Sequence, residues 1–123
     1  MQSSQLAYSA LVQQAESHIV SSVPLDQAEA WRSADLNVAT RAQIVSAIVF
    51  VALLAKSMSD DADFQADVAG RIGVINQHPA GRALAKAHLG RMTLAPTAEL
   101  SEYGLPLEVV TERLGWLCSI IGE

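Results

Sequence analysis

The strongest constraint on the fold is a run of apolar residues over 42–55, bounded by Arg41 and Lys56. Isoleucine, valine, leucine and alanine dominate this run and leave no clean polar face, so a helix made of it must be surrounded by other parts of the protein. Such a helix would be about 21 Å long, whereas a bilayer core is roughly 30 Å thick. We therefore expect a buried central helix over 40–58 and no membrane span.

The rest of the chain is divided by proline and glycine into segments with helical periodicity. Apolar residues recur every three or four positions in each main segment, and no long stretch alternates with period two. A short turn of helix is also expected over 97–104. These patterns predict an all-α protein, a compact bundle of about five helices with short connecting turns, in a single domain over 1–123.

Helix ends are marked by residues with known capping preferences. Asp26 and Thr40 each precede a Glu or Gln by three positions, which is the spacing of a capping box. Ser59 is expected to cap the next helix. A further helix is expected to begin at Pro79, and Gly90 to help end it.

The helix after Ser59 has one side made of small residues, opposite its core stripe. Small side chains let another backbone come close, at a cost in helix propensity. A close neighbour is therefore expected on this side, which is formed by Ala62, Ala66, Ala69, Gly70 and Gly73.

Nothing in the chain has the spacing of a metal site. The acidic residues near 60 suit a helix start, where carboxylates complement the positive end of the helix dipole, and no glycine-containing calcium loop surrounds them. The histidines are scattered, with no pair four residues apart. We expect no metal and no cofactor. The residues in question are Asp60, Asp61, Asp63, Asp67, His18, His78 and His88.

Motifs of catalysis are also missing from the sequence. It has no glycine-rich phosphate loop, no Gly-x-Ser-x-Gly and no paired carboxylates. Cys118 has no base on its own helix face, which favours a packing thiol. We therefore expect a protein that is not an enzyme. A single cysteine and a start without the features of a secretion signal favour a cytoplasmic protein.

The formal net charge of -5 argues against general binding to nucleic acid, and we expect no such partner. One segment differs, because 68–98 contains basic residues and no Asp or Glu. Residues 107–116 resemble the first helix and turn of a helix-turn-helix, but the residues after them are apolar. A DNA-binding regulator that uses the basic segment 71–91 is kept as an alternative. A second possibility is an anion held near Arg82, at the helix start after Gln77.

The last helix carries two apolar stripes, more than a small domain readily buries. The first stripe consists of Leu107, Val110, Leu114, Leu117 and Ile121. The second stripe, Val109, Trp116 and Ile120, is a candidate anchor patch for a partner. Together with the apolar central helix, this surplus predicts a homodimer or a protein partner. Arg82, Lys86 and Arg91 are candidates for a charged contact surface beside the patch.

These observations favour a non-enzymatic protein–protein interaction module, such as a small regulator, inhibitor, adaptor or immunity-type protein. The alternative is a small-molecule sensor with a pocket between helices near His88, Met92 and Trp31. His88 lies on an apolar helix stripe, and its simpler interpretation is a core histidine bonded to a carbonyl.

Overall fold

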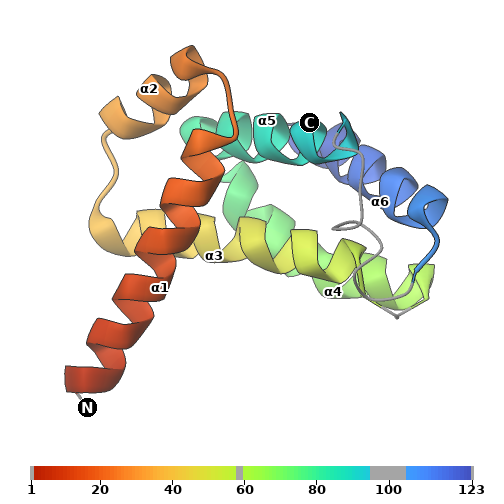
Figure 1. Cartoon of the computed structure of the whole chain (residues 1–123), viewed down its shortest axis with the longest axis horizontal. Helices are drawn as coiled ribbons and strands as arrows, with labels where there is room; N and C mark the ends of the chain where they lie inside the picture. Colours follow the sequence, from red (N-terminus) through yellow and green to blue (C-terminus); the bar gives the residue numbers. More distant parts are fainter. Residues whose placement is uncertain (1, 58–59, 95–104, 123) are drawn as a thin grey trace.

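The computed structural model describes residues 2–57, 60–94 and 105–122, and this part of the chain folds into six α-helices without a strand (Figure 1). The prediction of an all-α bundle is confirmed, with six helices in place of about five. The turn of helix expected over 97–104 lies outside the described residues. The helices are α1 Gln2–Ser21, α2 Leu25–Ser33, α3 Val38–Ala55, α4 Asp61–Asn76, α5 Pro79–Leu94 and α6 Leu107–Ile120.

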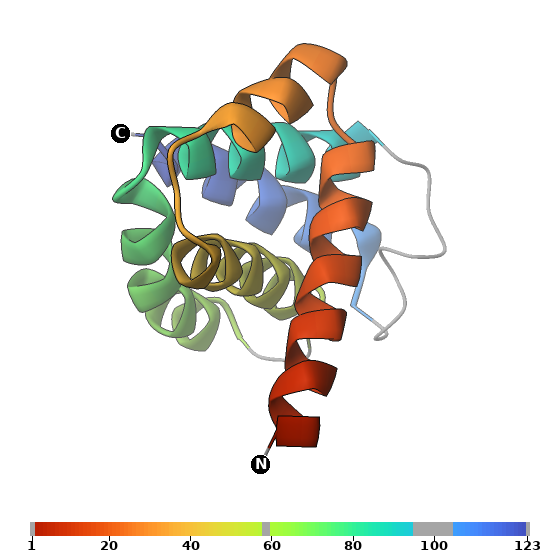
Figure 2. The same cartoon turned by 90° about the vertical axis from the view of Figure 1, so that its left-hand side faces the viewer.

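The helices are arranged around α3, which contacts α1, α4, α5 and α6. α1 runs across α3 and also contacts α5, while α2 lies on α5 (Figures 1 and 2). α5 and α6 pack against each other on the far side of α3 from the start of α1. α1, α3 and α5 therefore bound a common space on one side of the bundle.

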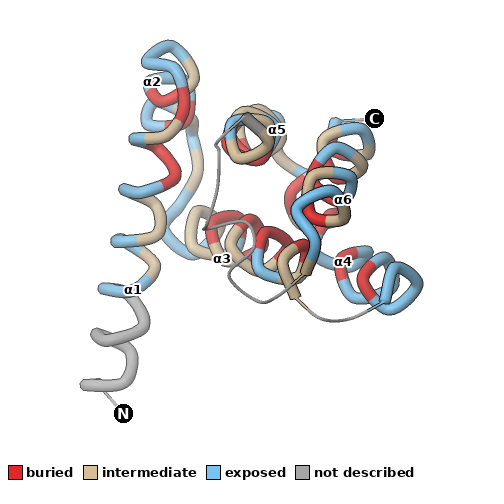
Figure 3. Tube along the Cα trace, turned by 45° about the vertical axis from the view of Figure 1, so that its right-hand side comes forward, coloured by how far each residue is buried: buried red, intermediate tan, exposed pale blue. Residues whose placement is uncertain are grey.

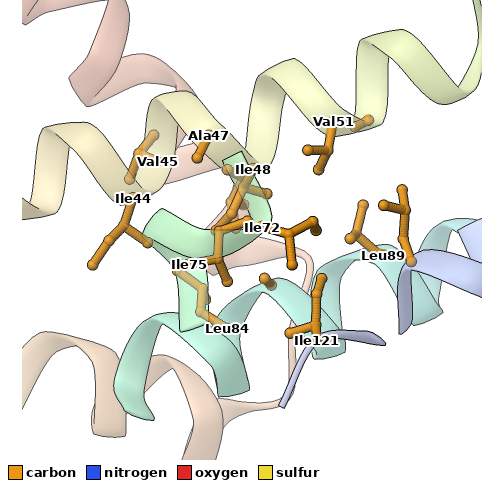
Figure 4. Close-up of a cluster of buried hydrophobic side chains, with 14 of the residues drawn as sticks. Ile44, Val45, Ala47, Ile48, Val51, Ile72, Ile75, Leu84, Leu89 and Ile121 are labelled. Atoms are coloured by element: carbon orange, nitrogen blue, oxygen red, sulfur yellow. The ribbon is translucent and has the colours of Figure 1, made fainter. Parts of the chain in front are cut away.

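The hydrophobic core forms where α3 faces the other helices. Its buried side chains meet those of α4, α5 and the end of α6 (Figure 4). The same cluster draws further side chains from α1 and α2. The apolar run thus supplies the centre of the core, as its composition predicts. The side chains at this centre are Ile44, Val45, Ile48, Val51, Ile72, Ile75, Leu84, Leu89 and Ile121.

Both ends of α3 lie earlier in the chain than predicted. Asn37, rather than Thr40, caps the helix, because the Asn37 side-chain oxygen accepts a hydrogen bond from the Thr40 backbone N–H at 2.8 Å. The helix ends at Ala55, where the Lys56 N–H donates to two preceding carbonyls. The central helix therefore spans 38–55 and not 40–58.

The length of α3 changes one step of the membrane argument. Its 18 residues make a helix about 27 Å long, and by length and composition alone it could cross a membrane. The length of α3 therefore does not exclude a membrane span, contrary to the expectation from the 14-residue apolar run over 42–55. Packing supports the core interpretation, because seven of its side chains are buried against neighbouring helices.

Two other predicted caps are also wrong by one or two positions. α2 has Pro24 at its N-cap and no side-chain cap, so Asp26 lies inside the first turn. At α4 the capping residue is Asp60, whose carboxylate accepts from the Asp63 N–H at 2.8 Å, and this is the role expected of Ser59. In each case a neighbouring residue supplies the extended backbone that a cap requires.

α5 begins at Pro79 as predicted, but it continues through Gly90 to Leu94. An interior glycine costs a helix only about 1 kcal/mol relative to alanine, and packing against α2 and α6 outweighs this cost. Gly90 is therefore an interior residue and does not end the helix.

The small-residue side of α4 faces solvent and not a second backbone, which corrects the prediction (Figure 3). Nothing lies within 4 Å of the position that a Cβ would take at Gly70 or Gly73. The close approach between helices occurs instead at Gly81, where a Cβ would lie 3.1 Å from the Ile44 side chain. α4 packs through its opposite stripe, which consists of Phe64, Val68, Ile72 and Ile75.

Two arginines connect helices by donating to backbone carbonyls. Arg113 of α6 is 5% exposed and donates to the carbonyl of Ser57 at 3.2 Å, and it forms an ion pair with Asp61 at 3.1 Å. Arg41 of α3 donates to the carbonyls of Trp31 at 2.8 Å and Ala34 at 2.6 Å. Both side chains satisfy carbonyls at a helix C-terminus, where a positive charge is favoured.

Candidate functional site

A cavity of about 450 Å³ lies between α1, α3 and α5. Its polar side chains are Gln14 and His18 of α1, Lys56 at the end of α3, and His88 of α5. None of the described residues that line it is acidic. Its volume falls within the roughly 300–1,000 Å³ typical of small-molecule sites. The remaining wall is apolar and consists of Leu11, Ala15, Ile19, Val49, Ala52, Leu53 and Met92.

His88 is the most buried polar side chain of this wall, at 7% exposed. Its Nδ1 lies 2.7 Å from the Ser22 hydroxyl oxygen, and that hydroxyl donates to the Ile19 carbonyl at 2.7 Å. Because a hydroxyl has one proton, this network assigns the ring proton of His88 to Nδ1 and leaves Nε2 as an acceptor. A hydroxyl thus takes the place of the carbonyl partner that we expected from the sequence.

One ring nitrogen of His88 is used within the fold and the other is not. Nδ1 contacts Ser22, which is not among the lining residues, whereas His88 itself lines the cavity. In the described part of the chain Nε2 has no hydrogen-bond partner. A buried acceptor without a donor costs free energy, so this atom favours a ligand group that carries a proton.

The charge state of His88 is set by its surroundings. Burial, followed by the positive charges of His18 and Lys56, lowers the pKa of His88 from 6.5 to about 4. The His18 ring meets the His88 ring edge-on, with 6.1 Å between their centroids. The His88 imidazole is therefore neutral at pH 7, with Lys56 as a cation in the same wall.

An apolar groove of about 230 Å³ continues the cavity along α1 and α3. Leu11 and Leu53 belong to both, and they are 65% and 42% exposed, so they form an open rim. At the far end, Arg71 of α4 stacks over the Phe50 ring at 4.5 Å. The cavity and the groove together form one site with a polar end and an apolar end. The groove is completed by Val12, Ala15, Val45, Ser46 and Val49.

Two of the three predicted ligand residues meet in this site and the third does not. His88 and Met92 line the cavity, one turn apart on α5. Trp31 points inward as predicted, but it lies in a different place, where its Nε1 donates to Glu16 at 3.0 Å and Arg41 stacks on its ring. It lines a separate cavity of about 410 Å³ between α1, α2 and α3.

The predicted anchor patch on α6 is half-buried. Trp116 packs edge-on against Phe64 of α4, with 5.7 Å between ring centroids, and Ile120 also packs against the core. Val109, near the start of the helix, is partly exposed. Much of the second apolar stripe is therefore used within the chain, and its role in binding a partner stays a prediction.

The predicted charged contact surface is only partly assembled. Arg82 donates to the Asn76 carbonyl at 3.1 Å, which satisfies a carbonyl at the end of α4. Lys86 is exposed beside Gly122 at the end of α6. Arg91 is exposed further along α5. Arg82 thus has a structural contact, and the other two remain candidates for a partner.

Two other predictions bear on chemistry. Burial raises the pKa of the Cys118 thiol, so the thiol is not activated, as expected for a packing residue. α6 is continuous over Leu107–Ile120, and the turn expected near Gly115 does not occur. The resemblance to a helix-turn-helix is therefore wrong, because the apolar stripe continues through Gly115 into the core.

Sequence reasoning missed three polar residues of the cavity wall, which are Gln14, His18 and Lys56. It also missed Ser22, which follows the end of α1 and meets His88 across 66 residues of sequence. In the sequence Lys56 marks only the end of the apolar run. Its place at the edge of the core could have been predicted from its position one residue beyond a buried helix, because a charged side chain there must reach solvent.

Comparison with known proteins provides no relative: no family model, no curated protein and no solved structure matches this chain. Function must therefore be inferred from the geometry of the chain itself.

Proposed function

We propose that this chain is a non-enzymatic binding protein, a small regulator whose site is the cavity between α1, α3 and α5 with the adjoining groove. The observation that carries this proposal is His88, whose Nε2 lacks a partner among the described residues, in the wall of a cavity of about 450 Å³. A cavity of this size with a few polar groups in an apolar wall is typical of a small-molecule site.

A second candidate function is association with a second copy of this chain, as in the protein–protein interaction module predicted from the sequence. It is favoured by the exposure of Leu11 and Leu53, which lie side by side at the rim of the groove. Exposed apolar side chains that gather in one place, unlike isolated ones, mark interaction surfaces. The alternative of a DNA-binding regulator that uses the basic segment 71–91 does not depend on α6 and stays a prediction.

Thermal denaturation with small molecules tests the proposed function. The molecules belong to three classes: an apolar carboxylate, an apolar alcohol and an apolar quaternary amine. At least one class is expected to raise the Tm by several degrees at saturation. This rise is expected to vanish in Ala15→Trp, because Ala15 lines both the cavity and the groove.

Ala10→Trp is the matched control, since Ala10 is exposed on the same helix and lines neither space. It is expected to keep the response of the native chain. The proposed function is wrong if no class raises the Tm, or if Ala15→Trp responds as the native chain does.

A further inference from the structure

The two ends of the site differ in chemistry, and together they restrict the ligand. One end has His18, Lys56 and His88 in a wall without a described acidic residue. The other end is a groove lined by apolar side chains of α1 and α3, with Ser46 as its one polar lining residue. A ligand that matches both ends has a negatively charged head and an apolar tail.

The head group is restricted further by His88. This residue lines the cavity, and its Nε2 is an acceptor that has no donor in the described part of the chain. A permanently charged sulfate offers no proton to this atom, and a quaternary amine would be repelled by Lys56. A carboxylic acid fits both conditions, because it can transfer its proton to Nε2, and the resulting carboxylate is then paired with the imidazolium and with Lys56.

We infer that the site binds a monocarboxylic acid with an unbranched apolar tail. The carboxyl group lies between His88, His18 and Lys56, and the tail follows the groove past Leu53 toward Phe50. This inference rests on the proposed function and adds the chemical class of the ligand. No covalent bond forms between ligand and protein. Because the acid is ionised in solution at pH 7, its binding as a carboxylate–imidazolium pair takes up one proton from solvent, which bonds to Nε2 of His88.

Isothermal titration calorimetry with decanoate tests this inference, at concentrations below those at which decanoate aggregates. Decanoate is expected to bind at least tenfold more tightly than 1-decanol, since the charge-assisted contacts are missing in the alcohol. Decyltrimethylammonium is expected not to bind. Titrations at pH 7 in two buffers of different ionisation enthalpy are expected to show uptake of up to one proton per decanoate.

Matched variants locate the head group. Lys56→Met is expected to weaken decanoate binding by roughly tenfold or more. Lys86→Met removes the same charge from an exposed site outside the cavity and is expected to leave binding unchanged. His88→Asn is expected to abolish the proton uptake. If that variant does not fold, the proton uptake measured with the native chain and the decanoate affinities of the two lysine variants still test the inference.

The failures of the two proposals are distinguishable. Binding of 1-decanol or decyltrimethylammonium that equals or exceeds that of decanoate, and that Ala15→Trp abolishes, would leave the proposed function standing and overturn the carboxylic acid. Equal losses in Lys56→Met and Lys86→Met, or decanoate binding without proton uptake, would also overturn it. If none of the three molecules binds, both proposals are wrong.

Discussion

His88 and Arg113 are the two buried polar residues of the described chain, and they are satisfied in opposite ways. Arg113 keeps its charge, because it donates to the Ser57 carbonyl, pairs with Asp61 and stacks on a phenylalanine ring. His88 has one hydroxyl partner, and its burial, followed by the charges of His18 and Lys56, favours the neutral ring. A buried side chain takes the charge state that its neighbours can compensate.

The low pKa of His88 predicts a pH dependence of stability. Between about pH 6.5 and pH 4 the unfolded chain binds a proton at this residue and the folded chain does not, so the free energy of unfolding falls as the pH falls through this window. From pH 7 to pH 5 the expected loss is about 2 kcal/mol. Urea denaturation at these two pH values measures it.

The contribution of His88 is isolated by substitution. The native chain is expected to lose about 2 kcal/mol more over this interval than His88→Gln does. His78→Gln, which removes a histidine elsewhere, is expected to behave like the native chain. Equal pH dependence in the native chain and His88→Gln would show that the imidazole is not held neutral by the fold.

Which single residues could be predicted depends on whether the signal is local. The inward positions of Trp31 and His88 could be predicted from their place on apolar helix stripes. Their partners could not, because Glu16 of α1 and Ser22, one residue beyond the end of α1, meet them only after the helices pack. For the same reason, the residues of the polar end of the site could not be predicted from the sequence.

At the scale of helices, the ends are decided by residues just outside the apolar pattern. Thr40 has the correct spacing to a glutamine, but Asn37 lies at the point where the backbone is extended, with φ -77° and ψ 168°. A side-chain cap needs both an accepting group and this backbone. Periodicity could therefore predict that α3 exists, and its exact start could not be read from spacing alone.

The cap of α3 supplies a direct test at this scale. Asn37→Ala is expected to lower the free energy of unfolding by about 1 kcal/mol, because the Thr40 N–H loses its acceptor. Thr40→Ala keeps that N–H and is expected to change stability by less than about 0.5 kcal/mol. Chemical denaturation of both variants measures the difference. A larger loss of stability in Thr40→Ala than in Asn37→Ala would show that Thr40 caps the helix, as the capping box in the sequence predicts.

At the scale of the whole molecule, the fold class could be predicted and the site could not. An apolar run bounded by charges, with amphipathic helices around it, leads to a helical bundle with that run at the centre. The cavity exists only because α1 crosses α3 and meets α5, and no pattern in the sequence encodes that crossing. The sequence predicts surplus apolar surface on α3 and α6. In the structure the exposed Leu53 of α3 lines the groove together with Leu11 of α1, and Leu107 is the exposed leucine of α6.

The same surface predicts how the molecule associates. Light scattering over a concentration series is expected to show a dimer that Leu11→Gln and Leu53→Gln weaken, because both leucines are exposed at the rim of the groove. Leu107→Gln is the matched control, since Leu107 is 45% exposed on α6 and lies outside the groove. It is expected to leave the mass unchanged.

A tail that fills the groove and a second copy that covers it cannot occupy the rim at the same time. By mass action, saturating decanoate is therefore expected to shift the dimer toward the monomer, and it is expected to have no such effect on Ala15→Trp. A dimer that persists with bound decanoate, or one that Leu107→Gln disrupts as much as Leu11→Gln does, would place the interface elsewhere. In that case the half-buried stripe of Val109, Trp116 and Ile120 on α6 becomes the surface to test, because it was predicted from the sequence as the anchor patch.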